Sequence, residues 1–222
     1  ILRSPHAHAR ILNIDTSKAE QLPGVVAVIT AKDVPSTFYG ISPARYDETI
    51  LAIEKVLQVG DKVAAVAAVD EETAVKALSL IDVEYEVLPA VLDPLRAMDE
   101  DQPQIHPQYE RNISVEIHQD FGDVEMAFQQ SHLVRTDRFQ GNRATHVPME
   151  PHAAISKWEN GKLTIWSSTQ SPHYFQYHIS RVFGLKMGDV RVIKPTVGGG
   201  FGGKLEPSAA EYVSAPRAMK TR

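Results

Sequence analysis

The chain has 222 residues, of which 43% are hydrophobic and 23% charged, as in an ordinary globular protein. Its net charge of −5, without a basic block, argues against a nucleic-acid partner and against binding to an anionic membrane surface. The absence of cysteine excludes disulfides, zinc–thiolate sites and iron–sulfur clusters on this polypeptide. No apolar run reaches the length of a membrane span, so we expect no membrane partner.

The first half of the chain predicts short strands separated by small helices. Alternating or β-branched patterns predict strands at 9–14, 25–29, 63–69 and 82–87. Capping residues precede helices that we predict at 18–22 and 71–80, and a turn that we predict at 31–33. The run at 25–29 is typical of a buried strand, and the irregular run at 38–49 is expected to form a loop.

A change of composition divides the chain in two. Residues 99–112 are rich in proline, glutamine and acids, and we interpret them as a linker between domains at 1–98 and 113–222. In the second half we predict helices at 122–130 and 172–183, and strands at 132–139, 153–158, 163–167 and 189–197. The pair Asn160-Gly161 predicts a hairpin turn.

The most specific signal is the run 197–204, Val-Gly-Gly-Gly-Phe-Gly-Gly-Lys. Its glycines allow positive φ angles and a close approach of the main chain to a ligand. A strand is predicted before this loop, and Glu206-Pro207-Ser208 suits the start of a helix after it. A strand followed by a glycine-rich loop and a helix N-terminus predicts a site for an anionic or phosphate-bearing cofactor.

Several interpretations of this loop stay open on the residues alone. Gly198, Gly200 and Gly203 satisfy G-x-G-x-x-G, but a dinucleotide-binding domain also needs a βαβ unit and an acid about 20 residues further on. The run also nearly matches the P-loop motif G-x-x-x-x-G-K-[S/T]. However, Leu205 occupies the position where that motif has the hydroxyl that binds Mg²⁺. A glycine-rich surface turn is the remaining alternative.

The run STQSP…VRVIKPTVGGGFGGK resembles the molybdopterin-binding large subunit of the xanthine dehydrogenase and aldehyde oxidase family of molybdenum hydroxylases. The segments SPHAHARI, LPGVVAVITAKDVP, VGDKVAAVAAVDEETAVKAL and VEYEVLPAV resemble the α/β hammerhead domain of these subunits, and the opening ILRSPHAHAR is most similar to the 4-hydroxybenzoyl-CoA reductase branch. The resemblance implies an α/β (α+β) fold with a hammerhead-like domain followed by the first part of a molybdopterin-binding domain. It also implies that the chain is incomplete at both ends.

The resemblance implies cofactor-binding roles for Gln170, Gly199, Gly200, Phe201 and Gly202. In the family the matching glutamine hydrogen-bonds an oxygen ligand of molybdenum, so Gln170 would act in the second sphere of the metal. Phe201 would contribute its backbone N–H, and its ring would shape the pocket. The family's catalytic glutamate is expected beyond Arg222, so no catalytic residue is assigned within this chain.

Other polar residues near these motifs receive weaker assignments. His146, Glu150 and His152 are separated by prolines and cannot form a helical metal-binding face. Glu150 is interpreted as a structural or second-sphere group, with direct participation as the alternative. His6 and His8 are interpreted as structural because no third ligand accompanies them.

The implied reaction is a two-electron oxidation or reduction at an sp² carbon of an aldehyde, an N-heterocycle or an aromatic thioester. Xanthine-specific members carry glutamate where this chain has Leu205, so purine hydroxylation is not expected. The implied cofactor is molybdenum–molybdopterin in its cytosine dinucleotide form. Because this chain lacks cysteine, [2Fe–2S] clusters and FAD would lie on partner subunits or domains, in the cytoplasm. The alternative is a non-catalytic, truncated or split-subunit module that needs a partner chain.

Overall fold

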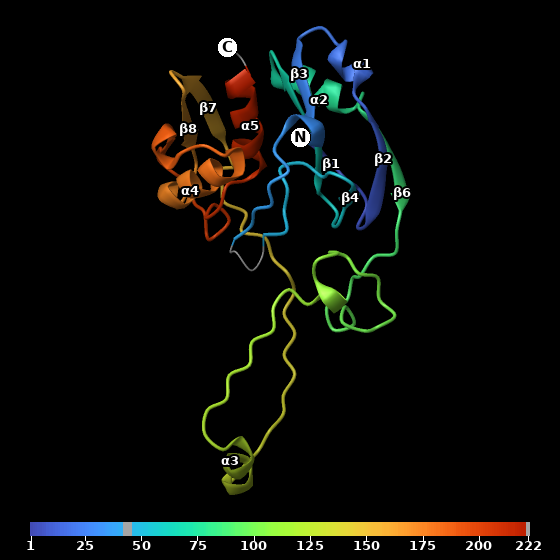
Figure 1. Cartoon of the computed structure of the whole chain (residues 1–222), viewed down its shortest axis with the longest axis vertical. Coiled ribbons are helices and arrows are strands. Elements are labelled where there is room, and N and C mark those ends of the chain that lie inside the picture. Colours follow the sequence, from blue (N-terminus) through green and yellow to red (C-terminus); the bar gives the residue numbers. More distant parts are fainter. Residues whose placement is uncertain (42–45, 221–222) are drawn as a thin grey trace.

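The computed structural model describes residues 1–41 and 46–220. Two lobes lie side by side, one built from the N-terminal strands and the other from the C-terminal hairpin and helices (Figure 1). A long arm, residues 114–147, leaves both lobes and carries a short helix at its tip (Figure 1). The architecture is mixed α/β, as predicted.

The strands of the first lobe are β1 (Leu2–Arg3), β2 (Ala9–Asp15), β3 (Val25–Thr30), β4 (Lys55–Val56), β5 (Lys62–Ala68) and β6 (Asp82–Val87). Its helical segments are α1 (Ser17–Glu20), a 3-10 turn at Ala31–Asp33 and α2 (Glu71–Leu78). Within the described part of the chain, the strands form antiparallel sheets in the orders β1-β5-β3 and β4-β2-β6. The predicted strands and helices of this half are present as β2, β3, β5, β6, α1 and α2, with small differences at their ends, whereas β1 and β4 were not predicted.

Capping hydrogen bonds and small buried side chains explain the helical segments of this lobe, and one strand prediction is corrected. The side chain of Asp70 accepts a hydrogen bond from the Thr73 N–H and caps α2, and Thr30 and Asp33 form a reciprocal capping box. The buried alanines Ala64 and Ala77 let α2 pack closely on β5. The prediction of a buried strand at 25–29 is wrong, because β3 is an edge strand and Val26 is 51% exposed.

The elements of the second lobe and arm are α3 (Val124–Gln130), β7 (Ala154–Glu159), β8 (Lys162–Ser167), α4 (Pro172–Phe183), a 3-10 turn at Met187–Asp189, β9 (Val190–Ile193) and α5 (Ala209–Lys220). β7 and β8 form an antiparallel hairpin, and β9 pairs with β8 in parallel after the crossover helix α4. Asn160 and Gly161 have φ angles of 51° and 76°, as the predicted hairpin turn requires.

Several predicted bounds in the second half are wrong. Residues 132–139 form no strand, because they lie in the exposed arm without a neighbouring strand to pair with. The strand predicted at 189–197 ends at Ile193, where its pairing with β8 stops. The last helix begins at Ala209, and not at Glu206. The loop expected at 38–49 contains an isolated bridge between Tyr39 and Glu48, while its residues 42–45 lie outside the described residues.

The predicted linker is organised by its own hydrogen bonds. Asn112 accepts a hydrogen bond from the Ile105 N–H at 2.8 Å and donates to the carbonyls of Ala97 and Pro103. Gln104 donates to three more carbonyl groups of the same segment. The segment 99–112 is therefore a compact loop in spite of its polar composition.

The two lobes share one hydrophobic cluster. Its buried members from the first lobe are Ile29, Tyr39, Ile50, Leu51 and Ala65, and those from the second are Leu163, Ile165, Ile179, Val182, Val190, Tyr212 and Ala215. The rings of Tyr39 and Tyr212 meet across the interface with their centroids 4.2 Å apart. Because this core is continuous, the first lobe supports the sheet that carries the candidate site.

Candidate functional site

Gln170 and the glycine-rich loop 198–203 follow two neighbouring parallel strands. Gln170 comes shortly after β8, and the loop follows β9. Because the carboxyl ends of parallel strands share one edge of a sheet, this is the edge where α/β folds bind ligands. The Gln170 N–H donates to the carbonyl of Lys204 at 2.9 Å, so the two predicted parts of the site are in contact.

The side chain of Gln170 is held in one orientation by the loop. Its Oε1 accepts hydrogen bonds from the N–H groups of Gly202 at 3.1 Å and Lys204 at 3.2 Å. Among the described residues, its Nε2 donates no hydrogen bond. Since an amide presents one acceptor and one donor end, Gln170 offers only its NH₂ group to a ligand.

The loop also presents main-chain donors. Gly199, Phe201 and Gly202 have φ angles of 94°, 54° and 93°, which place them in the left-handed region. Considering only the part of the chain that the structure describes, the N–H groups of Gly199, Gly200 and Phe201 make no hydrogen bond. Successive free N–H groups in such a turn form an anion-binding concavity.

Side chains of this same chain leave little room for a Cβ atom at three glycines of the loop. A Cβ atom at Gly198 would lie 2.6 Å from Cβ of Glu150, and one at Gly200 would lie 2.6 Å from Cδ of Gln170. A Cβ atom at Gly203 would lie 3.0 Å from Cγ of His146, which is tighter than an ordinary contact. The loop is therefore packed on its neighbours before any ligand is considered.

Glu150 and Lys204 join the two ends of the loop. Glu150 Oε2 accepts hydrogen bonds from the Gly198 N–H at 2.6 Å and from Lys204 Nζ at 2.8 Å. The hydrogen bond from Lys204, and then that from Gly198, lower the pKa of Glu150 below its ordinary value. Glu150 is thus an ionised part of the loop's support, which agrees with a structural or second-sphere role and not with that of a base.

Phe201 is the exposed aromatic residue of the loop. Its side chain is 73% exposed, and its ring lies over Gly199, where an added Cβ would come 3.2 Å from Phe201 Cε2. A positive φ is unusual for a bulky residue and costs on the order of 1 kcal/mol. The fold therefore holds the Phe201 ring beside the free N–H groups at the expense of some backbone strain.

The helix that follows the loop does not begin at the site, contrary to the prediction. The first residue of α5 is Ala209, so Leu205 to Ser208 separate it from the loop. Glu211 Oε2 accepts hydrogen bonds from the Ser208 N–H and hydroxyl, both at 2.8 Å, and caps this helix start. The dinucleotide motif needs the helix to open within the glycine run, so its structural context is missing here.

The other sequence candidates do not form a metal site. His6 packs edge-to-face on Tyr85, and His8 Nδ1 lies 2.6 Å from the carbonyl oxygen of Pro89. In the described ranges 1–41 and 46–220, no group of three or more histidine and acidic side chains could hold a metal ion. The Glu150–Lys204 pair and the packing of His146 were not predicted, because no local pattern links residues so far apart in sequence.

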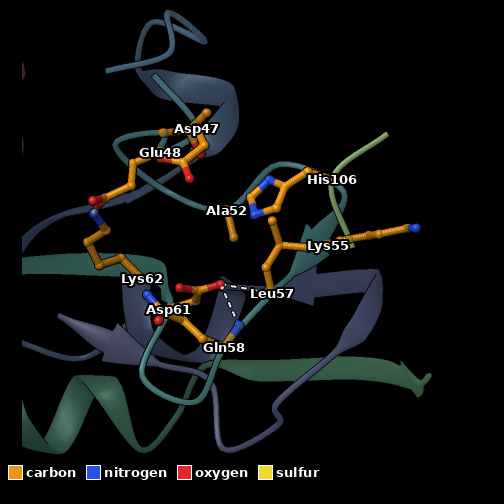
Figure 2. A pocket seen from close by; sticks show the side chains of 10 residues that line it. Asp47, Glu48, Ala52, Lys55, Leu57, Gln58, Asp61, Lys62 and His106 are labelled. Carbon is orange, nitrogen blue, oxygen red and sulfur yellow. Dashed lines mark hydrogen bonds and ion pairs between the residues drawn. The ribbon is translucent and has the colours of Figure 1, made fainter. Parts of the chain in front are cut away.

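A polar cavity of about 320 Å³ is lined by residues of the first lobe and by His106 of the segment 99–112 (Figure 2). Its lining comprises Asp47, Glu48, Thr49, Ala52, Lys55, Leu57, Gln58, Asp61, Lys62 and His106. Asp61 accepts hydrogen bonds from the N–H groups of Leu57 and Gln58, and Lys62 pairs with Glu48. None of the predicted site residues lines this cavity.

Comparison with known proteins identifies the family. Residues 1–89 match the model of the aldehyde oxidase and xanthine dehydrogenase a/b hammerhead domain, and residues 105–222 match that of the molybdopterin cofactor-binding domain. The chain is 40% identical over 210 residues to the nicotinate dehydrogenase large molybdopterin subunit of Eubacterium barkeri, covering 94% of this chain and 48% of that subunit. It is 36% identical to the carbon monoxide dehydrogenase large chain of Afipia carboxidovorans, with 92% of this chain and 27% of that one covered.

Solved structures share the fold. The aldehyde oxidoreductase from Desulfovibrio gigas superposes with a TM-score of 0.86 and 32% identity, over 99% of this chain and 25% of that chain. Quinoline 2-oxidoreductase from Pseudomonas putida 86 gives a TM-score of 0.87 and 30% identity, over 98% and 29%. The chain thus spans about half the length of one relative and about a quarter of the others.

Within the described residues, no helix is both long and apolar enough to cross a membrane. The range 105–222, which matches the molybdopterin cofactor-binding domain, contains the strand edge at which Gln170 meets the glycine-rich loop. The chain belongs to the xanthine dehydrogenase and aldehyde oxidase family of molybdopterin-binding large subunits, with a hammerhead domain and a molybdopterin cofactor-binding domain.

Proposed function

We propose that this chain supplies one wall of the cofactor site in a molybdenum hydroxylase-type oxidoreductase. The observation that carries the proposal is a set of donors at the strand edge that have no hydrogen-bond partner among the described residues, namely the N–H groups of 199–201 and the NH₂ group of Gln170. Molybdopterin is rich in oxygen acceptors, so these donors fit the cofactor that the matched domain binds. The reaction class is a two-electron oxidation or reduction at an sp² carbon.

The residues of this chain would orient and shield the cofactor. When bound, the cofactor supplies the redox centre that exchanges two electrons with the substrate. Gln170 would donate a hydrogen bond from a neutral amide that does not titrate, and the N–H groups of Gly199, Gly200 and Phe201 would bind acceptor oxygens. The exposed Phe201 ring would exclude water from the same side. The assignment of Gln170, Gly199, Gly200, Phe201 and Gly202 to cofactor binding is part of this proposal.

The substrate that we propose is an aldehyde, an N-heterocycle other than a purine, or an aromatic thioester. Leu205 follows the Gly-Gly-Lys run and is partly exposed, so no carboxylate is available there to hold a purine. The opening ILRSPHAHAR supports the 4-hydroxybenzoyl-CoA reductase branch as the finer assignment.

The remaining components of the enzyme are proposed from its chemistry. We assign the cytosine dinucleotide form to the cofactor, and [2Fe–2S] clusters and FAD to partner subunits or domains in the cytoplasm. The placement of the clusters and FAD on partners is supported by the absence of cysteine and by relatives whose names describe them as a large subunit or a large chain. A second candidate is a large subunit divided over separate chains. It is favoured by the coverage of 48% of the nicotinate dehydrogenase subunit against 27% of the carbon monoxide dehydrogenase chain.

The test is to purify the complete protein from its native host and to measure its molybdenum, pterin and released nucleotide. Molybdenum with pterin and cytidine monophosphate is the expected result. Dye-linked oxidation of aldehydes, N-heterocycles and aromatic thioesters then identifies the substrate class. Bound adenine nucleotide without molybdenum would overturn the proposal.

A further inference from the structure

A charge pair bridges the entry and the exit of the glycine-rich loop. Glu150 Oε2 accepts the Gly198 N–H at the entry and Lys204 Nζ at the exit. The side chain of Lys204 is fully buried (0% exposed), whereas that of Glu150 is partly exposed. A buried ammonium group without its partner is strongly destabilising, so Lys204 depends on Glu150 for this conformation.

The backbone of Lys204 connects this pair to Gln170. The Lys204 N–H donates to Gln170 Oε1, and the Lys204 carbonyl accepts from the Gln170 N–H and from the Thr169 hydroxyl. A shift of Lys204 would therefore break several hydrogen bonds that fix the Gln170 amide. The ion pair and the orientation of Gln170 form one connected network.

We propose that Glu150 and Lys204 are positioning residues, which hold the loop in the conformation that presents the donors of 199–201 and the Gln170 NH₂ group to the cofactor. The inference deepens the proposed function and rests on it. Lys204 does not act as a phosphate-binding lysine, because its ammonium group is buried and paired with Glu150. Glu150 does not act as a base, because its Oε2 already accepts two hydrogen bonds and the Lys204 ammonium favours its ionised form.

The experiment uses the complete protein and compares Glu150→Gln, Lys204→Met and the double variant. Glu159→Gln is the matched control, because it removes the same charge from the exposed Lys157–Glu159 pair of β7. Each single variant is expected to lower the molybdenum and pterin content about tenfold, as expected for loss of an outer-shell partner. The double variant is expected to recover part of that content, because no buried charge is left without a partner.

Hydrogen exchange separates this inference from the proposed function, because it does not require a bound cofactor. Peptides that contain Gly198 to Lys204 are expected to exchange faster in both single variants than in Glu159→Gln or the unaltered protein. The residual loaded enzyme of Glu150→Gln should show a lower kcat at unchanged KM, together with an altered Mo(V) resonance.

The outcomes lead to different conclusions. Unaltered exchange in the loop of both single variants would overturn the positioning role, whether or not the protein holds molybdenum. Faster exchange in a protein that never contains molybdenum would support the positioning of the loop and overturn the proposed function. Full molybdenum content with an unchanged resonance in both single variants would overturn the link between the pair and the cofactor.

Discussion

Gly200 lies directly against the amide of Gln170, with no room for a side chain between them. A Cβ atom added at Gly200 would lie 2.6 Å from Gln170 Cδ, well inside van der Waals contact. The same amide accepts hydrogen bonds from Gly202 and Lys204. The glycine that borders the site is thus required by the residue that would face the cofactor.

Replacing Gly200 with alanine is expected to displace Gln170 and to lower the molybdenum content of the complete protein on the order of tenfold. Gly188→Ala is the control, because no atom lies within 4 Å of its added Cβ and its φ is not positive. Metal analysis measures the effect, and circular dichroism checks that the protein is folded. Equal molybdenum in the two variants would contradict the prediction.

Two substitutions at Gln170 are expected to separate its acceptor from its donor. Gln170→Glu keeps an oxygen for the Gly202 and Lys204 N–H groups but lacks the NH₂ group. We expect this variant to retain molybdenum while turnover falls by about 10²–10³, the effect of losing a preorganised donor worth roughly 2–4 kcal/mol. Gln170→Ala removes both functions and should lose metal as well. Normal turnover of Gln170→Glu would exclude the donor role.

The stability of the lobe interface is expected to fall in acid because of His178 on α4. This side chain is buried, its ring nitrogens have no partner among the described residues, and the rings of Tyr46 and Tyr174 lie beside it. Burial, and then the Arg181 charge, lower the pKa of His178. In the unfolded chain a histidine has a pKa near 6.5, so this contribution to stability is complete above that pH and is lost as the pH falls below it.

The check is the change in melting temperature between about pH 7.5 and about pH 5.5. His178→Phe cannot titrate and should show a smaller decrease than the unaltered protein. His173→Phe removes an exposed histidine from the same helix and is the matched control. An equal decrease in the unaltered protein and in His178→Phe would refute the assignment.

The arm 114–147 is expected to cause self-association when residues 1–222 are expressed alone. Phe121, Phe128 and Phe139 are exposed along it, the last to 91%. Replacing these three residues with serine should reduce association in sedimentation velocity experiments. The control replaces the exposed Val59 and Val69 of the first lobe with serine. If the arm substitutions leave self-association unchanged, the surface responsible for it lies elsewhere in the molecule.

Residues 1–222 alone are expected to show no turnover even when the cofactor is supplied. Glu150 is engaged with Gly198 and Lys204, and its lowered pKa makes it a poor proton acceptor. The assay is dye-linked oxidation of aldehydes, purines and aromatic thioesters. Turnover that depends on molybdenum would reveal a base within this chain.

The sequence predicted correctly those elements whose ends are set by their own capping and turn residues. Proline at the first position and left-handed Gly184 at the end gave α4 its correct bounds. The run 132–139 has a strand-like pattern but forms no strand, because pairing depends on a neighbour that the pattern does not reveal. The early end of β9 depends in the same way on its partner β8.

The candidate site was predicted in part. The glycine-rich run could be found from the sequence, and the resemblance to the family added Gln170. The support of the loop could not be predicted, because Glu150 and Lys204 are 54 positions apart and meet only through tertiary packing. The sequence also did not indicate that Gly200 is needed to make room for Gln170.

The parallel pairing of β8 and β9 has a consequence for biosynthesis. The residues that contact the loop lie between His146 and Lys204. They are therefore synthesised within one stretch of the chain, which contains the β8–α4–β9 unit. Because domains fold as units during synthesis, and because Tyr212 and Ala215 of α5 belong to the core of this sheet, the edge is expected to assemble on the ribosome once α5 has emerged. Codon choices that slow translation after α5 are therefore expected to favour the formation of this wall of the candidate cofactor site.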